Sequence, residues 1–230
     1  MIKIKSKITY KDIGIFSFGR KKSARVKNKV LRKFVNTTLT DIALKKLKIF
    51  KEQSFFAAYD NDFKKKCATH NVRYVERNYK SSIIDEPILS ILHFLKEQKY
   101  KKFIIINACV PFLKIETIKK FLKFCLQNPN LPAFSVIKKN NFFLDGDKKP
   151  LNFNKKAKTI NTKKTKALYE FAHSLYYFDK EFFFKNGKYW NYDNLRYFEI
   201  NDKYEQIAID TMEDFKFAEK IWIKNAKNFS

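Results

Sequence analysis

A short apolar run near the start of this chain leads directly into a basic loop, and this junction narrows the possible folds most. The run is Ile13–Phe18, and the loop that follows reads GRKKSARVKNK, residues 19–29. The loop holds two of the six arginines, Arg20 and Arg25, and a guanidinium offers a planar fork of donors that matches phosphate or carboxylate. A buried strand followed by a basic, serine-containing loop and a helix is typical of α/β proteins that bind oligophosphates.

The rest of the chain alternates between predicted strands and predicted helices. The strands are expected at 55–58, 72–75, 103–107, 133–137 and 206–210, and the helices at 38–50, 62–68, 87–95, 115–127 and 211–226. Residues 103–107 are mostly apolar without a break, which is typical of a parallel strand covered on both faces. The pattern predicts a three-layer α/β/α sandwich around a mostly parallel, Rossmann-like sheet, with ligands at the carboxyl ends of its strands.

The pattern changes between residues 139 and 190. Short aromatic segments there surround a DGD turn and the basic run NKKAKTINTKKTK. We expect an antiparallel excursion within one domain that spans residues 1–230. Such an insert commonly forms a lid, a wall of an acceptor pocket or a dimer arm, and a simple mobile loop is the alternative.

Composition excludes several classes of protein. The longest strongly apolar runs fall well short of the ~20 residues that a membrane-spanning helix needs. The first residues alternate lysine with apolar side chains, unlike a secretory signal, so we expect a soluble, cytoplasmic protein. The three cysteines are widely spaced and form no CxxC pair, which argues against both a disulfide framework and a zinc site.

The formal net charge of +26 raises the question of nucleic acid. Lysine is spread over nearly every segment, and it accompanies abundant asparagine, isoleucine and phenylalanine. This distribution favours a compositional origin of the charge over a dedicated binding stripe. A nucleic-acid binder stays open as an alternative, and it predicts an affinity that falls steeply with salt.

Four short segments, in order along the chain, carry a family resemblance. They are the basic loop with Arg20, Ser23, Arg25, Asn28 and Lys29, the helix start NTTLTDIALKKL, the segment NACVPFL, and the closing segment AIDTMEDFKFAEKIW. Over roughly residues 12–226 the chain resembles the acylneuraminate cytidylyltransferases and their relatives, which activate acidic sugars with CTP. The resemblance implies a fold of the nucleotide-diphospho-sugar transferase type.

The resemblance also implies a reaction. CMP would pass from CTP to an acidic sugar or related acid, with release of pyrophosphate, for the biosynthesis of a surface glycan. Arg20 and Lys29 would hold the triphosphate, and Asp210 would be the ligand of a magnesium ion, Mg2+, so these three are the implied catalytic residues. Positioning and charge stabilisation are the main needs of a reaction at a polyanion, and these residue types supply both.

Further residues follow from the same resemblance. The implied nucleotide-binding residues are Gly19, Lys21, Lys22, Ser23, Arg25, Asn28, Arg77, Ser81 and Asn107, and the implied acceptor-binding residues are Tyr169 and His173. Relatives often pair, so a homodimer is possible. Simpler roles stay open. An asparagine at a strand end, such as Asn107, often only forms hydrogen bonds with backbone groups, and Asp210 would also stabilise the start of a helix.

Four positions depart from the family pattern. Relatives usually place glycines where Lys21 and Lys22 stand, and glycine lets a backbone approach a phosphate at no steric cost. Some relatives carry aspartates where this chain has Cys109 and Ala208. A family member that binds nucleotide but has lost or altered its chemistry is therefore a second alternative.

Overall fold

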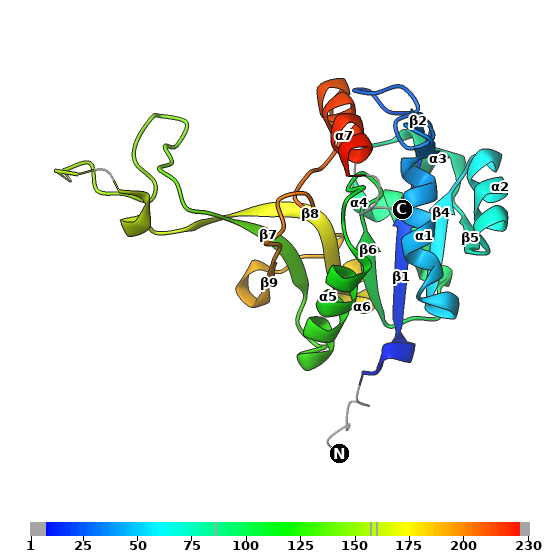
Figure 1. Ribbon diagram of the computed structural model, residues 1–230. Helices are drawn as coiled ribbons and strands as arrows, with labels where there is room; N and C mark the ends of the chain where they lie inside the picture. The colour runs from blue at the N-terminus through cyan, green and yellow to red at the C-terminus, as the bar shows by residue number, and fades with distance from the viewer. Residues whose placement is uncertain (1–7, 86, 157, 160, 226–230) are drawn as a thin grey trace, which may run out of the picture.

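A seven-stranded mixed sheet forms the centre of the molecule (Figure 1). The computed structural model describes residues 8–85, 87–156, 158, 159 and 161–225. Along the sheet the strands are β5 (Arg73–Glu76), β4 (Ser54–Ala58), β1 (Ile13–Phe18), β6 (Lys102–Ile106), β8 (Leu168–Asp179), β7 (Ala133–Lys139) and β9 (Arg196–Glu199). All run in one direction except β8, which is antiparallel to both of its neighbours. The predicted mostly parallel sheet is confirmed.

Helices cover both faces of the sheet. They are α1 (Leu39–Lys48), α2 (Asn61–His70), α3 (Tyr79–Ile83), α4 (Ile88–Ile91), α5 (Ile115–Gln127), α6 (Lys180–Asn186) and α7 (Met212–Lys224), and a small ribbon pairs β2 (Lys33–Phe34) with β3 (Thr37–Thr38). Successive strand residues point to opposite faces. Accordingly, Ile104 and Ile106 belong to the core shared with α1, α2, α5 and α7, whereas Phe103 and Ile105 belong to the core shared with α4 and α6. The three-layer architecture is therefore confirmed.

Threonine caps begin two of the helices. Thr38 accepts a hydrogen bond from the backbone N–H of Asp41 at 3.1 Å at the start of α1. At the start of α7, Thr211 and Asp214 form a complete capping box. These caps satisfy backbone donors that would otherwise lack an intrahelical partner.

Two expectations about secondary structure were wrong. Residues 206–210 form no strand, and the last strand is β9, which pairs with β7 at the edge of the sheet. The alternating isoleucines of 206–210 reflect burial: Ile209 is fully buried in the core, and its N–H donates to the Cys109 carbonyl at 2.9 Å. The helix expected at 87–95 is only the short α4, followed by a 3-10 turn at His93–Glu97.

Residues 139–190 divide into two parts. Strand β8 and helix α6 belong to the body, because β8 lies between β6 and β7 and pairs with both. Residues 140–167, which we call the arm, project far from the sheet in Figure 1. The antiparallel character expected of this region is confirmed by the β7–β8 pairing. Among the described residues no helix is long and apolar enough to cross a membrane.

Candidate active site

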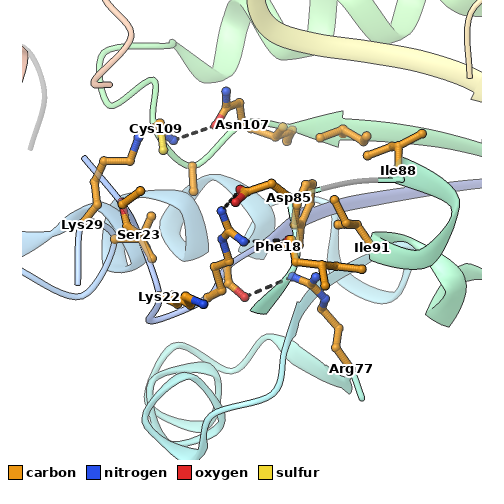
Figure 2. A pocket seen from close by; sticks show the side chains of 18 of the residues that line it. Phe18, Lys22, Ser23, Lys29, Arg77, Asp85, Ile88, Ile91, Asn107 and Cys109 are labelled. Atoms are coloured by element: carbon orange, nitrogen blue, oxygen red, sulfur yellow. Dashed lines mark hydrogen bonds and ion pairs between the residues drawn. The ribbon is translucent and has the colours of Figure 1, made fainter. Parts of the chain in front are cut away.

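A cavity of about 370 Å³ lies at the carboxyl ends of β1 and β6. Its walls come from the basic loop (residues 19–29), the segment 77–91, the start of the loop after β6, and two tyrosines. Figure 2 shows Lys29, Ser23 and Cys109 towards one end of the cavity and Ile88 and Ile91 towards the other. The cavity therefore has a polar end and an apolar end, at the sheet edge where α/β proteins bind their ligands.

Close packing at its first residue anchors the basic loop. The N–H of Gly19 donates to the Ala57 carbonyl at 3.0 Å. A Cβ atom at Gly19 would lie 2.9 Å from the Phe63 ring and 3.0 Å from the Phe56 ring, so this position requires glycine. Asn28 adopts a left-handed conformation with φ of 55°, which asparagine tolerates better than most residues, and this turn leads the chain back towards α1.

Carboxylates from other segments neutralise four cations of the basic loop. Lys21 pairs with Asp62 at 2.6 Å, on the side of α2. Arg20 forms an ion pair with Asp85 and also donates to the Ile84 carbonyl at 2.7 Å. The side chain of Asp85 is 76% exposed, so it is free to move away from Arg20 into water.

Arg25 and Lys29 share one carboxylate oxygen of Asp210. The distances to Asp210 Oδ1 are 3.0 Å from Arg25 and 3.2 Å from Lys29. Lys29 also donates to the Ile209 carbonyl at 2.7 Å, and its side chain is only 12% exposed. Asp210, predicted to hold a metal ion, thus stands beside two cations predicted to hold phosphates.

Arg77 is buried and fixes the floor of the cavity. Its guanidinium donates to the Gly19 carbonyl at 3.3 Å and to both the hydroxyl and the carbonyl of Ser81. The same group lies over the Phe18 ring, 5.3 Å from its centroid. Burial lowers the pKa of Arg77 to about 10, and the nearby charge of Arg20 adds to the effect. The contacts to Gly19 and Ser81 tie the basic loop to the segment before α4.

Hydrogen bonds from three sides hold the loop after β6, residues 107–114, which we call the β6–α5 loop. Asn107 Oδ1 accepts from the Cys109 N–H at 2.9 Å, and Asn107 Nδ2 donates to the His173 carbonyl at 2.7 Å. On the other side, Glu205 accepts from the Lys114 N–H at 2.6 Å and from the Thr117 hydroxyl at 2.9 Å. Glu205 therefore caps the start of α5, where a negative charge is favoured.

The third support is Lys46, which reaches the β6–α5 loop from α1. Its Nζ atom donates to the carbonyls of Val110 and Pro111, at 2.9 Å each. Lys46 is buried, and burial lowers its pKa to about 7, while the charge of Glu205 opposes this shift. A neutral amine still has two hydrogens, enough for both carbonyls.

Most of the predicted site residues line the cavity. They are Gly19, Lys22, Ser23, Arg25, Arg77 and Asn107 from the nucleotide-binding set, and Arg20 and Lys29 from the catalytic set. Lys21, Asn28, Ser81 and Asp210 are not among the lining residues. Lys21 turns to Asp62, Asn28 forms the turn, and Ser81 holds Arg77.

The predicted acceptor residues lie outside the lining. His173 is exposed, has a φ of 52° where β8 bulges, and its Nδ1 lies 2.6 Å from the Tyr176 hydroxyl. Tyr176 does line the cavity, so His173 is one contact removed from it. Tyr169 is 56% exposed on the ribbon opposite Lys138, and its acceptor role stays a prediction.

Sequence reasoning missed several residues that build the site. Asp85, just before the helix expected at 87–95, is the partner of Arg20. Tyr176 and Tyr189 line the cavity from the irregular aromatic region. The spacing of the tyrosines gives no signal of a pocket, and neither does that of Asp85, which lies 65 positions from Arg20.

Cys109 also lines the cavity, and it is half-buried. Burial raises the pKa of its thiol, and the neighbouring Lys29 only partly opposes the shift, so the thiol stays protonated near neutral pH. In the described part of the chain no three histidine, cysteine, aspartate or glutamate side chains cluster as a metal site. Any ion at Asp210 would therefore need phosphate oxygens and water as further ligands, which suits magnesium.

Solved structures of other proteins share this fold. CMP:2-keto-3-deoxy-manno-octonic acid synthetase, solved in complex with CTP, superposes with a TM-score of 0.68 over 93% of this chain and 99% of that chain, at 10% identity. The 4-diphosphocytidyl-2C-methyl-D-erythritol synthase of Anaerococcus prevotii superposes with a TM-score of 0.64 over 94% of this chain and 100% of that chain, at 16% identity. A cytidylyltransferase of Leptospira borgpetersenii superposes with a TM-score of 0.55 over 95% of this chain and 96% of that chain, at 12% identity.

At these identities the structural matches establish the fold. No curated protein sequence matches the chain. The family itself is established by the sequence, since residues 19–229, nearly the whole chain, match the cytidylyltransferase family. That stretch contains the basic loop, the β6–α5 loop and Asp210 together. This chain therefore belongs to the cytidylyltransferase family of enzymes.

Proposed function

We propose that this enzyme transfers CMP from CTP to an acidic sugar or related acid for a surface glycan, as the acylneuraminate branch of the family does. The observation that carries the proposal is that Arg20, Arg25 and Lys29 all line the cavity, and that Arg25 and Lys29 also pair with Asp210 just outside its lining. A triphosphate is the ligand class that needs several cations within one short loop. The similar CMP-ketodeoxyoctonate synthetase structure with bound CTP supports the same nucleotide here.

The basic loop has the parts that nucleotidyl transfer requires. The acceptor oxygen forms a bond to the α-phosphorus while the bond from that phosphorus to the β-phosphate oxygen breaks. Negative charge then accumulates on the leaving pyrophosphate, where Arg20 and Lys29 would stabilise it. Ser23 lies between Arg20 and Lys29 in the sequence and also lines the cavity, so its hydroxyl would add a neutral donor.

Asp210 is the residue that would hold a magnesium ion. Magnesium in such sites is bound through one or two carboxylates, with substrate phosphates and water as the other ligands, and a lone half-exposed carboxylate fits that pattern. The ion would offset charge on the phosphates. Arg25 and Lys29 now share Asp210 Oδ1, and in our proposal they transfer part of their contact to the phosphates when the nucleotide binds.

An acidic acceptor is supported by the charge of the cavity. Among the described residues, five cationic side chains line it (Arg20, Lys22, Arg25, Lys29 and Arg77), against one carboxylate, Asp85. This excess suits a second anion beside the nucleotide. Tyr176 and Tyr189 form a wall suited to the face of a sugar ring, and His173, which contacts Tyr176, would help to orient the acceptor.

A direct assay of pyrophosphate tests the proposal. The protein is incubated with magnesium, each nucleoside triphosphate in turn, and a panel of nonulosonic, ketodeoxy and phosphorylated acids. We expect release only with CTP and only with an acid. Release with another nucleotide, or with neutral sugars alone, would contradict the proposal.

One observation favours the alternative of a nucleotide-binding member with lost chemistry. Ala208 leaves Asp210 without the nearby second aspartate that some relatives carry, and Lys21 turns away from the cavity to Asp62. This alternative predicts that CTP raises the unfolding temperature equally with and without magnesium. It also predicts no pyrophosphate over the whole panel.

A further inference from the structure

A second cavity, of about 700 Å³, lies beside the β6–α5 loop, and among the described residues it shares no lining residue with the candidate active site. We call it the side cavity. Residues 107–109 line the active site, whereas residues 111–114 of the same loop line the side cavity. Its other walls come from β3 and the turn before it, α1, the last residue of α2, the start of α5 and the end of α7. A ligand there would contact the β6–α5 loop without entering the active site.

The floor of the side cavity is apolar. Ile42 and Phe112 are buried there, and the Trp222 ring packs against Phe112 with centroids 5.9 Å apart. Ile115, at the start of α5, is half-buried and adds to the apolar surface. A ligand that fills this cavity therefore needs an apolar body, because a small inorganic ion would leave the floor in contact with water.

Hydrogen-bond donors stand at the rim of the side cavity. Lys45 is exposed, and in the described part of the chain no hydrogen bond or ion pair engages its ammonium group. Asn36 adds a side-chain amide and Thr37 adds a hydroxyl. An ammonium group beside neutral donors suits an anion, because hydrogen bonds that carry charge are the strong ones.

The carboxylates that line the side cavity do not cancel this ammonium group. Asp41 is paired with Lys66 at 2.7 Å and lies 3.0 Å from His70 Nε2. Glu116, at the start of α5, interacts with the charge of Lys114. The positive charge at the rim is therefore available to a ligand.

A strained turn forms part of the rim. Val35, between β2 and β3, has a φ of 56°, a left-handed conformation that is rare for a β-branched residue. Its N–H donates to Glu219 of α7 at 3.2 Å, and Asn36, which follows it, lines the side cavity. Strained backbone persists where the surrounding structure enforces it, and such strain is concentrated at functional sites. The turn thus places Asn36 at the cavity at a cost in backbone energy.

We propose that the side cavity is a second ligand site, for a small organic anion whose apolar body fills it. The anionic group pairs with Lys45 and accepts from the Asn36 amide, while the apolar body covers Ile42 and Ile115. Lys46 also lines this cavity and binds two carbonyls of the β6–α5 loop, so a bound ligand adds to the supports of that loop. Binding here needs neither CTP nor catalysis.

Fluorine NMR of para-fluorophenylacetate with the full chain tests this proposal. We expect the resonance to broaden as protein is added, and the uncharged para-fluorophenylacetamide to bind about tenfold more weakly or less. Trp190→Phe leaves Trp222 as the only tryptophan, and its fluorescence should change with the same affinity. Lys45→Gln should weaken binding about tenfold, as expected for the loss of a hydrogen bond between charged groups.

The matched control is Lys48→Gln, which changes an exposed lysine of the same helix that does not line the side cavity. It removes the same charge and should leave the affinity nearly unchanged. Equal loss in both variants would show attraction by net charge, and equal binding of the acetamide would show an apolar contact without charge recognition; either result overturns the proposal. So would loss of binding in Lys29→Met, which would place the probe in the active site, or no broadening by the acid at all. Unfolding temperatures check that each variant is folded.

Discussion

The two loops that face each other across the cavity are positioned in opposite ways. The β6–α5 loop is held by buried groups: Lys46 binds two of its carbonyls, and Glu205 caps the helix that follows. The basic loop is anchored at Gly19 and Arg77, but Arg20 and Arg25 are held by carboxylates at the surface. Buried hydrogen bonds fix a position, whereas exposed ion pairs contribute little stability and exchange partners readily.

This difference assigns a separate task to each loop. The β6–α5 loop acts as a fixed wall, so changes in its supports should reduce stability. The basic loop holds its cations in place through exposed carboxylates, which a polyanion replaces in the proposed function, so changes there should alter nucleotide binding while the fold persists. The predictions below test that division, from the largest expected effect to the smallest.

Lys29→Met should have the largest effect. Lys29 lines the cavity and contacts both Ile209 and Asp210, so its loss removes an ammonium that we propose binds the phosphates. We expect kcat/KM to fall about a hundred- to a thousandfold, the usual result of removing one preorganised donor from a transition state. Steady-state pyrophosphate kinetics measure the effect. Lys27→Met, an exposed lysine of the same loop, is the matched control and should change kcat/KM little.

Lys46→Met should act on stability. The substitution leaves the carbonyls of Val110 and Pro111 without their donor, so we expect the free energy of unfolding to fall by about 1–3 kcal/mol. Denaturant titration measures it, and Lys48→Met, on the exposed side of α1, is the control. A large drop in kcat/KM with unchanged stability would assign this lysine a catalytic task and break the comparison.

The titration of Lys46 gives an independent check. Because burial lowers the pKa of Lys46 in the folded protein to about 7, the unfolded chain binds more protons there between pH 7 and 10.5. The contribution of Lys46 to stability therefore rises with pH through that range. Denaturant titrations at several pH values should show this rise in the parent protein, and the Lys46→Met variant should lack it.

Asp85→Asn should have the smallest effect, and a favourable one. In the proposed site Asp85 would compete with phosphate for the guanidinium of Arg20, and as an exposed partner it contributes only modestly. We expect CTP to bind about two- to fivefold more tightly, as measured by calorimetry. Asp62→Asn removes an equal charge beside Lys21, outside the cavity, and should not tighten binding to the same degree. Weaker binding in Asp85→Asn would show that this carboxylate supports the nucleotide site.

Apolar patterns predicted the layers of this fold well. Ile13–Phe18 and Ile115–Gln127 begin and end where the sequence places them, because each is a clear apolar run or a clear helical stripe. Residues 206–210 were wrongly predicted as a strand, because burial against a loop produces the same alternation of apolar and polar residues as burial in a strand. Strand β9 was missed because RYFE mixes charged and aromatic side chains at a sheet edge.

The site was predictable only where it follows from topology. Parallel strands end at one edge, so the basic loop and the β6–α5 loop had to meet. The individual contacts do not follow from that rule. Lys46 reaches carbonyls 64 and 65 positions away, and Arg20 reaches an aspartate 65 positions away, so both depend on how packed elements place side chains.

A crystal structure with CTP and magnesium tests the central claim most directly. We expect density for the triphosphate between Arg20 and Lys29, an ion beside Asp210, and an Arg20 guanidinium released from Asp85. We also expect the β6–α5 loop to keep its bonds to Lys46. A nucleotide bound away from the basic loop, or an Arg20–Asp85 pair still closed with CTP in the cavity, would contradict that claim.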